Sequence, residues 1–183
     1  MNVVDGVSKL EVDMIHAMLT KKCPPIYADI WKIGVNVSLR IGDLLQLKYD
    51  DLDLTERSVK LTEAKTGKAK HIRLNTAALT VITRRRQAYP NDTWLFQVHC
   101  NRAKNKPISR ISVGRAFSEV GALLGLTINT HSMRKSRGKV MYDNHVPIEK
   151  IAKVLNHSNT SSTLRYLGIT REEVLQTYDD FEL

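Results

Sequence analysis

The sequence predicts a mainly helical α+β domain with a small antiparallel β-sheet, and three observations support this prediction. Apolar residues recur at the spacing of an amphipathic helix along most of the chain. Two capping boxes, Ser8 with Glu11 and Thr170 with Glu173, mark the starts of the first and last helices. The two-residue alternation of a strand is limited to the region 59–74. Because 183 residues suffice for one hydrophobic core and not for two, we expect a single domain over residues 1–183.

Two helices and a short helical turn are predicted in the N-terminal quarter. The helix that begins after Ser8 carries an apolar stripe. The members of this stripe are Leu10, Met14, Ile15, Met18 and Leu19. The two prolines at 24–25 restart the chain, and the apolar segment 26–37 is predicted to be a core helix. Arg40 then opens a short turn of helix before an acidic loop at 50–53.

A β-hairpin is predicted next, because apolar residues alternate on both sides of a basic turn. Val59 and Leu61 precede the turn segment 65–68, Lys-Thr-Gly-Lys, and Ile72 and Leu74 follow it. We therefore expect two antiparallel strands with lysines at their tip.

The rest of the chain is predicted to be helical apart from one extended segment. Asn75 caps a helix that runs to Tyr89, and Trp94-Leu95-Phe96 forms a short buried strand or extended segment. Further helices are expected at about 112–124, 130–144 and 147–156, followed by a short helix that carries Tyr166 and a last helix to about Tyr178.

The charge of the chain favours a polyanionic partner. Lys and Arg number 28 against 19 Asp and Glu, which gives a net charge of +9, and nucleic acid is the commonest partner of such a protein. The basic residues are scattered rather than gathered on one amphipathic helix, which disfavours a membrane surface. The two cysteines form no framework and no metal-ligand spacing. With no signal peptide and no long apolar run, we expect a cytoplasmic protein that acts on DNA without a metal or cofactor.

A tyrosine and two histidines in the C-terminal third suit attack on a DNA phosphate. Tyr166 can act as the nucleophile, but only about one phenol in a thousand is ionised at neutral pH without help. His131 is the candidate base that removes its proton. His157 can donate a hydrogen bond to a phosphate oxygen.

Three cationic side chains complete the predicted active set. Arg40 and Arg134 can bind the non-bridging phosphate oxygens, because a guanidinium is planar and stays charged. Lys65, at the predicted hairpin tip, can give its proton to the departing 5′ oxygen. Lys68 and Lys70 compete for that role.

At these positions the chain resembles the tyrosine recombinases, or phage-type integrases, over nearly its whole length. The segment 39–47 is similar to the motif around the family's first catalytic arginine, and 64–68 to its hairpin lysine segment. Thr130-His131-Ser-Met-Arg134 resembles the HxxR box. Leu155-Asn156-His157, followed by Tyr166, is similar to the late histidine and nucleophile. Asn156 stands where glycine is common, Asp43 where glutamate is common, and Met133 where leucine is common.

The resemblance implies a tyrosine recombinase catalytic-domain fold and site-specific DNA recombination through a 3′-phosphotyrosyl intermediate, with no metal and no cofactor. It implies a bacterial or phage-encoded enzyme that works as a homo-tetramer on paired sites in double-stranded DNA, with exchange of the C-terminal helix between subunits and accessory DNA-bending proteins. Nothing in the sequence corresponds to the separate N-terminal core-DNA-binding domain that many members carry, so we expect the catalytic domain alone.

Each motif has an ordinary interpretation when it is taken alone. HxxR recurs by chance, Arg40 could pair with Asp43, Lys65 could be a solvated turn residue, and Tyr166 could be a packing residue with Tyr178 as its rival. Two other functions also remain open: a non-catalytic DNA-binding regulator with the same fold, and DNA relaxation of the type IB topoisomerase kind.

Further DNA contacts are predicted at basic residues that flank these motifs. They are Lys68, Lys70, Arg110, Arg115, Lys135, Arg137 and Lys139. The run Arg84-Arg85-Arg86 is either a backbone contact or a solvated face, and the sequence does not choose between the two.

Overall fold

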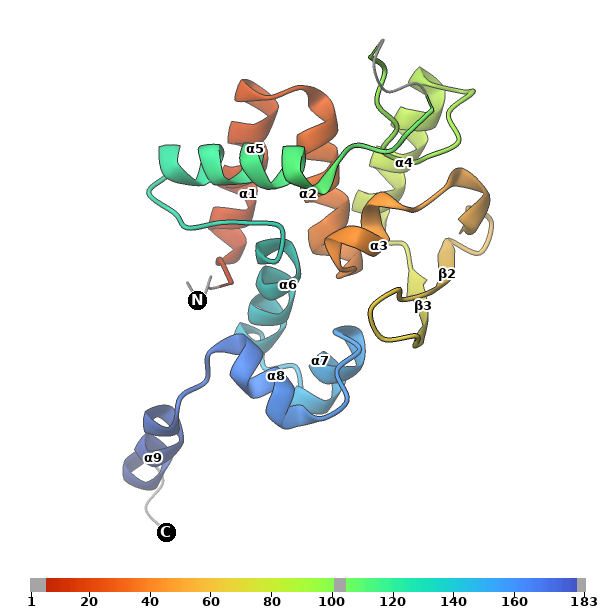
Figure 1. Ribbon diagram of the computed structural model, residues 1–183. Helices are drawn as coiled ribbons and strands as arrows, with labels where there is room; N and C mark the ends of the chain where they lie inside the picture. The colour runs from red at the N-terminus through yellow and green to blue at the C-terminus, as the bar shows by residue number, and fades with distance from the viewer. Residues whose placement is uncertain (1–5, 101–104, 181–183) are drawn as a thin grey trace.

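The computed structural model describes residues 6–100 and 105–180 and has the predicted architecture of helices around a small sheet (Figure 1). The helices are α1 (Lys9–Lys22), α2 (Pro25–Val37), α3 (Ile41–Leu45), α4 (Thr76–Ala88), α5 (Arg110–Leu123), α6 (Ser132–Asp143), α7 (Ile148–Val154), α8 (Thr160–Leu167) and α9 (Arg171–Asp180), with a 3₁₀ turn η1 (Tyr49–Asp51). The strands are β1 (Leu52–Asp53), β2 (Ser58–Thr62) and β3 (Ala69–Arg73). The mainly helical α+β prediction is confirmed.

The core lies between the N-terminal helices and α5 and α6. Helix α2 is almost entirely apolar and packs against α1, α4 and α6. Trp31 of α2 and Phe117 of α5 are fully buried, with their ring centroids 5.3 Å apart in an edge-to-face arrangement. Burial of such large rings is a main source of folding free energy in a domain of this size. This core fixes the end of α2, from which the chain enters the arginine-bearing turn at α3.

The sheet is a three-stranded antiparallel meander in the order β1-β2-β3. Val59 pairs with Ile72, and Leu61 pairs with Lys70, so these four residues share the face that is turned toward the core. The alternate residues face the other way. The loop 63–68 joins β2 to β3, as the alternation of apolar residues predicted.

Both predicted capping boxes are present. The Ser8 hydroxyl accepts from the Glu11 N–H while the Glu11 carboxylate accepts from the Ser8 N–H. Thr170 and Glu173 make the reciprocal pair before α9. These caps satisfy helix N–H groups that would otherwise lack partners, which explains why both helices begin where they do.

Three details differ from the sequence-based expectation. In α1, Leu10 is 71% exposed and Met14 is 44% exposed, because α1 packs mainly through Ile15 and Leu19. The segment 94–96 forms no strand but makes one isolated bridge, between Trp94 and Lys48. Helix α6 begins at Ser132 rather than at about Thr130, and His131 is its N-cap.

Helices α6, α7 and α8 form the C-terminal part of the body, and α9 projects away from it in Figure 1. Helix α6 approaches α8 closely at Gly138. A Cβ atom there would lie 2.9 Å from Cδ2 of Leu167 and 3.2 Å from Cδ1 of Leu155. Because any side chain would push these groups apart, glycine at this position lets α8 pack directly on α6.

Candidate active site

Four segments that are far apart in the sequence supply the predicted catalytic residues. Arg40 is the N-cap of α3, the hairpin loop 63–68 carries Lys65, and the start of α6 carries His131 and Arg134. The α7–α8 region carries His157 and Tyr166. In Figure 1, α7 and α8 lie below α6, and the β2–β3 loop lies beside α7.

The carboxylate of Glu63 lies between the two arginines. Its Oε2 atom is 2.6 Å from Nη1 of Arg40, and its Oε1 atom is 3.9 Å from Nη1 of Arg134. The Glu63 side chain is completely buried, while that of Arg40 keeps 22% of its surface exposed. The structure therefore brings Arg40 and Arg134, 94 positions apart, to one anionic group.

Arg134 is fixed by two backbone carbonyls from different parts of the chain. Its Nη1 atom donates to the Ser38 carbonyl at 2.7 Å, and its Nη2 atom donates to the Leu155 carbonyl. Its side chain is only 4% exposed. The guanidinium thereby ties the end of α2 to the end of α7, and its position is set before any ligand binds.

Tyr166 lies against His157, with ring centroids 5.1 Å apart and planes nearly perpendicular. The Nζ atom of Lys135 lies 5.3 Å from the centroid of the Tyr166 ring. The Tyr166 hydroxyl is buried and has no hydrogen-bond partner among the described residues. Burial raises the pKa of this phenol, and the charges of Arg134 and Arg40 oppose the rise. A phenol in this position needs a proton acceptor before it can attack.

The two histidines hold their neutral forms at neutral pH. Burial, together with the positive charges of Arg134 and Arg40, lowers the pKa of His157 to about 4. Its Nδ1 atom lies 3.0 Å from the hydroxyl of Thr163, which is buried. Partial burial and the charges of Arg110 and Arg134 also lower the pKa of His131. A neutral imidazole at position 131 can accept a proton.

The three hairpin lysines differ in their surroundings. Lys65 and Lys68 are exposed in the loop. Lys70 lies on the core-facing side of β3, and its Nζ atom donates to the Ser38 carbonyl at 3.1 Å, the same oxygen that accepts from Arg134. Burial and the nearby charge of Arg134 lower the pKa of Lys70 to about 8. Of the three lysines, Lys70 is therefore the one that shares a hydrogen-bond acceptor with Arg134.

The other predicted DNA contacts lie on α5 and α6. Arg110 and Arg115 are exposed on α5, and Lys135, Arg137 and Lys139 are partly buried on α6. The Nζ atom of Lys139 is 3.3 Å from the carboxylate of Asp143, one turn further along the helix.

All three arginines of the run 84–86 make contacts within the protein, although the side chain of Arg84 stays 61% exposed. Arg84 and Arg85 both pair with the buried carboxylate of Asp29, with Nη1 of Arg85 3.0 Å away, and Nε of Arg85 donates to the Leu95 carbonyl. Arg86 donates to the Asp92 carbonyl and lies over the Tyr49 ring. These arginines join α4 to α2 and to the segment 92–95.

Sequence reasoning did not single out Glu63, and it assigned no structural role at the site to Asp43 or Asn156. Glu63 accepts from Nδ2 of Asn156 at 2.7 Å and from the Thr66 hydroxyl at 3.0 Å. The Asp43 carboxylate accepts from the Ala64 N–H at 2.9 Å, which attaches the hairpin loop to α3. Asn156 has φ of +51°, a conformation that glycine and asparagine tolerate best, and this explains why glycine is common there. The sequence therefore carried a signal for Asn156, because an asparagine at a position where glycine is common indicates a left-handed backbone conformation.

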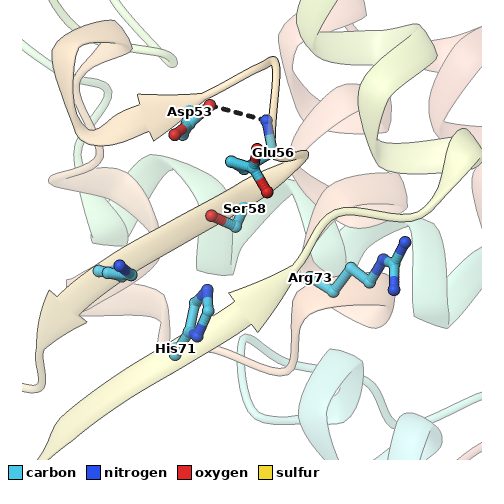
Figure 2. Close-up of a pocket in the computed structure, with 6 residues that line it drawn as sticks. Asp53, Glu56, Ser58, His71 and Arg73 are labelled. Carbon is cyan, nitrogen blue, oxygen red and sulfur yellow. Dashed lines mark hydrogen bonds between the residues drawn. The ribbon is translucent and has the colours of Figure 1, made fainter.

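Figure 2 shows a pocket on the face of the sheet opposite to Val59, Leu61 and Ile72. It is lined by Asp53, Glu56, Ser58, Lys60, His71 and Arg73. Apart from Glu56, which lies in the turn between β1 and β2, these residues occupy the strand positions that alternate with Val59, Leu61 and Ile72. Within the described ranges, no group of three or more His, Cys, Asp or Glu residues is arranged to hold a metal ion. The same part of the chain contains no helix both long and apolar enough to cross a membrane.

Comparison with known proteins identifies relatives over the whole of this structure. The profile of the phage integrase family matches residues 9–173. The probable integrase/recombinase YoeC of Bacillus subtilis is 31% identical over 183 residues, which is 99% of this chain and 98% of that protein. The tyrosine recombinase XerA of Pyrococcus furiosus is 24% identical over 141 residues, 77% of this chain and 49% of XerA.

Solved structures show the same fold at lower identity. A crystal structure of XerA recombinase has a TM-score of 0.74 and 16% identity, covering 98% of this chain and 64% of its own. A lambda integrase dimer bound to a core site has a TM-score of 0.71 and 18% identity, covering 91% and 60% of the two chains. The chain thus spans nearly all of YoeC but only about half to two thirds of these other relatives. On the extent of the family match and the identity to YoeC, the chain belongs to the phage integrase family of tyrosine recombinases.

Proposed function

We propose that this chain catalyses site-specific recombination of double-stranded DNA by cutting and rejoining strands through a phosphotyrosyl bond. The observation that carries the proposal is the placement of the buried Tyr166 hydroxyl beside His157 and the arginine pair. Several solved relatives are described as integrases or recombinases in complex with DNA, which supports duplex DNA as the partner. The charge of +9 is consistent with that partner.

In the cutting step, the Tyr166 oxygen forms a bond to the phosphorus of the scissile phosphodiester and the bond from phosphorus to the 5′ oxygen breaks. His131 takes the phenol proton. Arg40 and Arg134 stabilise the charge on the non-bridging oxygens, and His157 donates a hydrogen bond to one of them. The products are a 3′-phosphotyrosyl ester and a free 5′-hydroxyl.

Lys65 supplies the proton for the departing 5′ oxygen. Its exposed place in the hairpin loop allows it to enter a DNA groove and reach that atom. Rejoining reverses these steps when the 5′-hydroxyl of another strand attacks the ester. The bond energy is conserved in the ester, so the cycle requires no nucleotide hydrolysis.

The working assembly is a homo-tetramer on two DNA sites, linked by exchange of α9. Leu175 and Tyr178 of α9 are 47% and 78% exposed, and the helix carries Glu172, Glu173, Asp179 and Asp180. An exposed apolar stripe on an acidic helix is suited to packing against a neighbouring basic subunit. Flanking phosphate contacts come from Lys68, Lys70, Arg110, Arg115, Lys135, Arg137 and Lys139. Accessory DNA-bending proteins complete the assembly.

A suicide substrate tests the chemistry. In a duplex nicked next to the cleavage point, the short fragment that carries the new 5′-hydroxyl dissociates after cutting, so the reaction cannot reverse and the covalent adduct accumulates. We expect an adduct with the unmodified protein and with Tyr178→Phe, and none with Tyr166→Phe. An adduct that survives Tyr166→Phe contradicts Tyr166 as the nucleophile. No adduct with the unmodified protein on any tested site contradicts the proposal and favours a non-catalytic DNA-binding protein.

Two further measurements test recombination and assembly. Strand transfer between two marked sites, rather than relaxation of a supercoiled plasmid alone, distinguishes a recombinase from a topoisomerase-like enzyme. A stop after Gly168 removes α9, and we expect it to abolish cooperative assembly on DNA while single-site binding persists. Full cooperative assembly by this truncated protein contradicts exchange of α9.

A further inference from the structure

The buried carboxylate of Glu63 has no role in the chemistry described above, although it lies at the centre of the site. A negative charge there repels the incoming phosphate, so its presence needs a compensating benefit. Its two oxygens contact groups from every element that supplies a catalytic residue. These groups are the guanidinium of Arg40, that of Arg134, the Asn156 amide and the Thr66 hydroxyl.

We infer that Glu63 is a positioning residue that holds Arg40 in the orientation needed to bind the scissile phosphate, with Asn156 orienting the carboxylate. This inference rests on the proposed DNA-cutting function. It assigns Glu63 no direct contact with DNA.

The geometry at Arg40 supports this assignment. A guanidinium has five N–H donors, and the 2.6 Å ion pair from Nη1 to Glu63 leaves the others for a ligand. Arg134 is anchored by two carbonyls, whereas Arg40 donates no hydrogen bond to a backbone carbonyl within the described residues. Arg40 therefore depends on Glu63 for its orientation much more than Arg134 does.

The surroundings of Glu63 keep it ionised and fixed. Burial alone raises its pKa, but hydrogen bonds from Arg40, Asn156 and Thr66 outweigh burial and hold the pKa below the ordinary value. The backbone of Glu63 also closes the hairpin loop, since its carbonyl accepts from the Gly67 N–H and its N–H donates to the Lys68 carbonyl. A charged group attached to a closed loop is a rigid support for the Arg40 guanidinium.

Asn156 connects this support to the other half of the site. It precedes His157 directly, and its amide reaches Glu63 across 93 positions of sequence. In the resemblance to the integrases, glycine is common at this position, and glycine has no side chain with which to make this contact. The Glu63–Asn156 hydrogen bond links the hairpin loop to the segment that carries His157.

The test is single-turnover cleavage of the suicide substrate at saturating DNA, with DNA affinity measured separately. Glu63→Gln keeps the shape and the hydrogen-bond acceptor but removes the charge. We expect the cleavage rate constant to fall about 10- to 100-fold, because a misplaced catalytic group costs this much. The Kd for DNA should be unchanged or lower, because the net charge rises from +9 to +10. Glu63→Asp, which keeps the charge, should retain more activity than Glu63→Gln.

Glu56→Gln is the matched control, because it removes the same charge from an exposed position on the opposite face of the sheet (Figure 2). It should cleave at the unmodified rate. Asn156→Gly is compatible with the φ of +51° and removes only the amide. Its loss of rate should be several-fold in the original background and smaller in the Glu63→Gln background, because the two residues act through one contact.

A second readout does not depend on cleavage. In the DNA-free protein, ¹⁵N relaxation of the Arg40 Nε–H group should show greater side-chain mobility in Glu63→Gln than in Glu56→Gln. If folded Glu63→Gln cleaves at the unmodified rate, or if Arg40 is equally ordered in both variants, the assignment is wrong while the proposed function stands. If the unmodified protein forms no adduct, the proposed function fails and the assignment fails with it.

Discussion

The Nδ1 atom of His157 lies 3.0 Å from the Oγ1 atom of Thr163, and the threonine side chain is completely buried. A neutral histidine has one ring nitrogen that donates and one that accepts. When the Thr163 hydroxyl donates to Nδ1, the proton of the imidazole is on Nε2, where it can be given to a phosphate oxygen. Under the proposed mechanism, we expect this contact to select the tautomer in which Nε2 of His157 donates to a phosphate oxygen.

Thr163→Val should lower the cleavage rate constant about 10-fold, the equivalent of one hydrogen bond of about 1.4 kcal/mol. Valine has the shape of threonine, so the fold and the DNA affinity should be retained. Single-turnover cleavage measures the change. Thr80→Val, which removes an exposed hydroxyl from α4, is the control and should have no effect. An unchanged cleavage rate in Thr163→Val would show that the Thr163 hydroxyl does not orient His157 for cleavage.

The different surroundings of Lys65 and Lys70 lead to different expectations for a substrate with a sulfur in place of the 5′ bridging oxygen. A thiolate leaves without protonation, so loss of the general acid does not lower the cleavage rate of this substrate. Lys65→Ala should cleave the ordinary DNA slowly and the sulfur-containing DNA at nearly the unmodified rate. Lys70→Ala should be slow on both, because it disturbs the Ser38 carbonyl that also holds Arg134. If the sulfur-containing DNA restores the cleavage rate of Lys70→Ala and not that of Lys65→Ala, then Lys70 is the general acid.

Acid should destabilise the DNA-free protein in a defined pH window through His157. Its pKa is about 4 in the folded protein, against about 6.5 in an unfolded chain. Between these values the unfolded chain binds more protons, so stability is present above about pH 6.5 and is lost as the pH falls toward 4. His131 shifts in the same direction.

Urea unfolding between pH 7.5 and 4.5 measures this dependence. His157→Asn removes the titrating group and should show a shallower loss of stability on acidification than the unmodified protein. His145→Asn, at an exposed position after α6, should follow the unmodified protein. Identical pH dependence of the His157→Asn variant and the unmodified protein would contradict the pKa assignment.

The buried ion pair between Asp29 and Arg85 should make a large contribution to stability. Both side chains are about 5–6% exposed. Asp29→Asn leaves the Arg85 charge buried without its partner and should cost about 3 kcal/mol in the free energy of unfolding. Arg84→Ala should cost less than about 1 kcal/mol, because Arg84 pairs with the same carboxylate but is 61% exposed. Thermal or urea unfolding of the two variants checks the contrast, and equal losses would contradict it.

Local patterns in the sequence were sufficient to predict most of the fold. Capping boxes, the hairpin alternation and the Asn75 cap each depend on residues within a few positions of one another, and all three are present. The spacing of His131 and Arg134, and of His157 and Tyr166, is local in the same sense. The resemblance to a family supplied what spacing could not, which is that Arg40 belongs with them.

Long-range contacts account for what the sequence did not reveal. Glu63 directly follows strand β2, and no residue near it in the sequence predicts that its carboxylate is buried. The groups that contact it belong to Arg40, Arg134 and Asn156, which are 23, 71 and 93 positions away. Arg85 stands in a charge run, a pattern that is usually solvated, and its burial depends on Asp29 in a different helix. Both cases are polar groups whose burial becomes favourable only after tertiary pairing.

The close packing of α8 on α6 at Gly138 has a consequence for stoichiometry. Leu167 follows Tyr166 directly and packs on the helix that also carries Arg134. Under the proposed mechanism, the attacking tyrosine and the phosphate-binding arginine therefore belong to one polypeptide, and we expect each subunit to cut the strand to which it is itself bound. In an assembly that mixes intact and Tyr166→Phe subunits, we expect scission only at the half-sites occupied by intact ones.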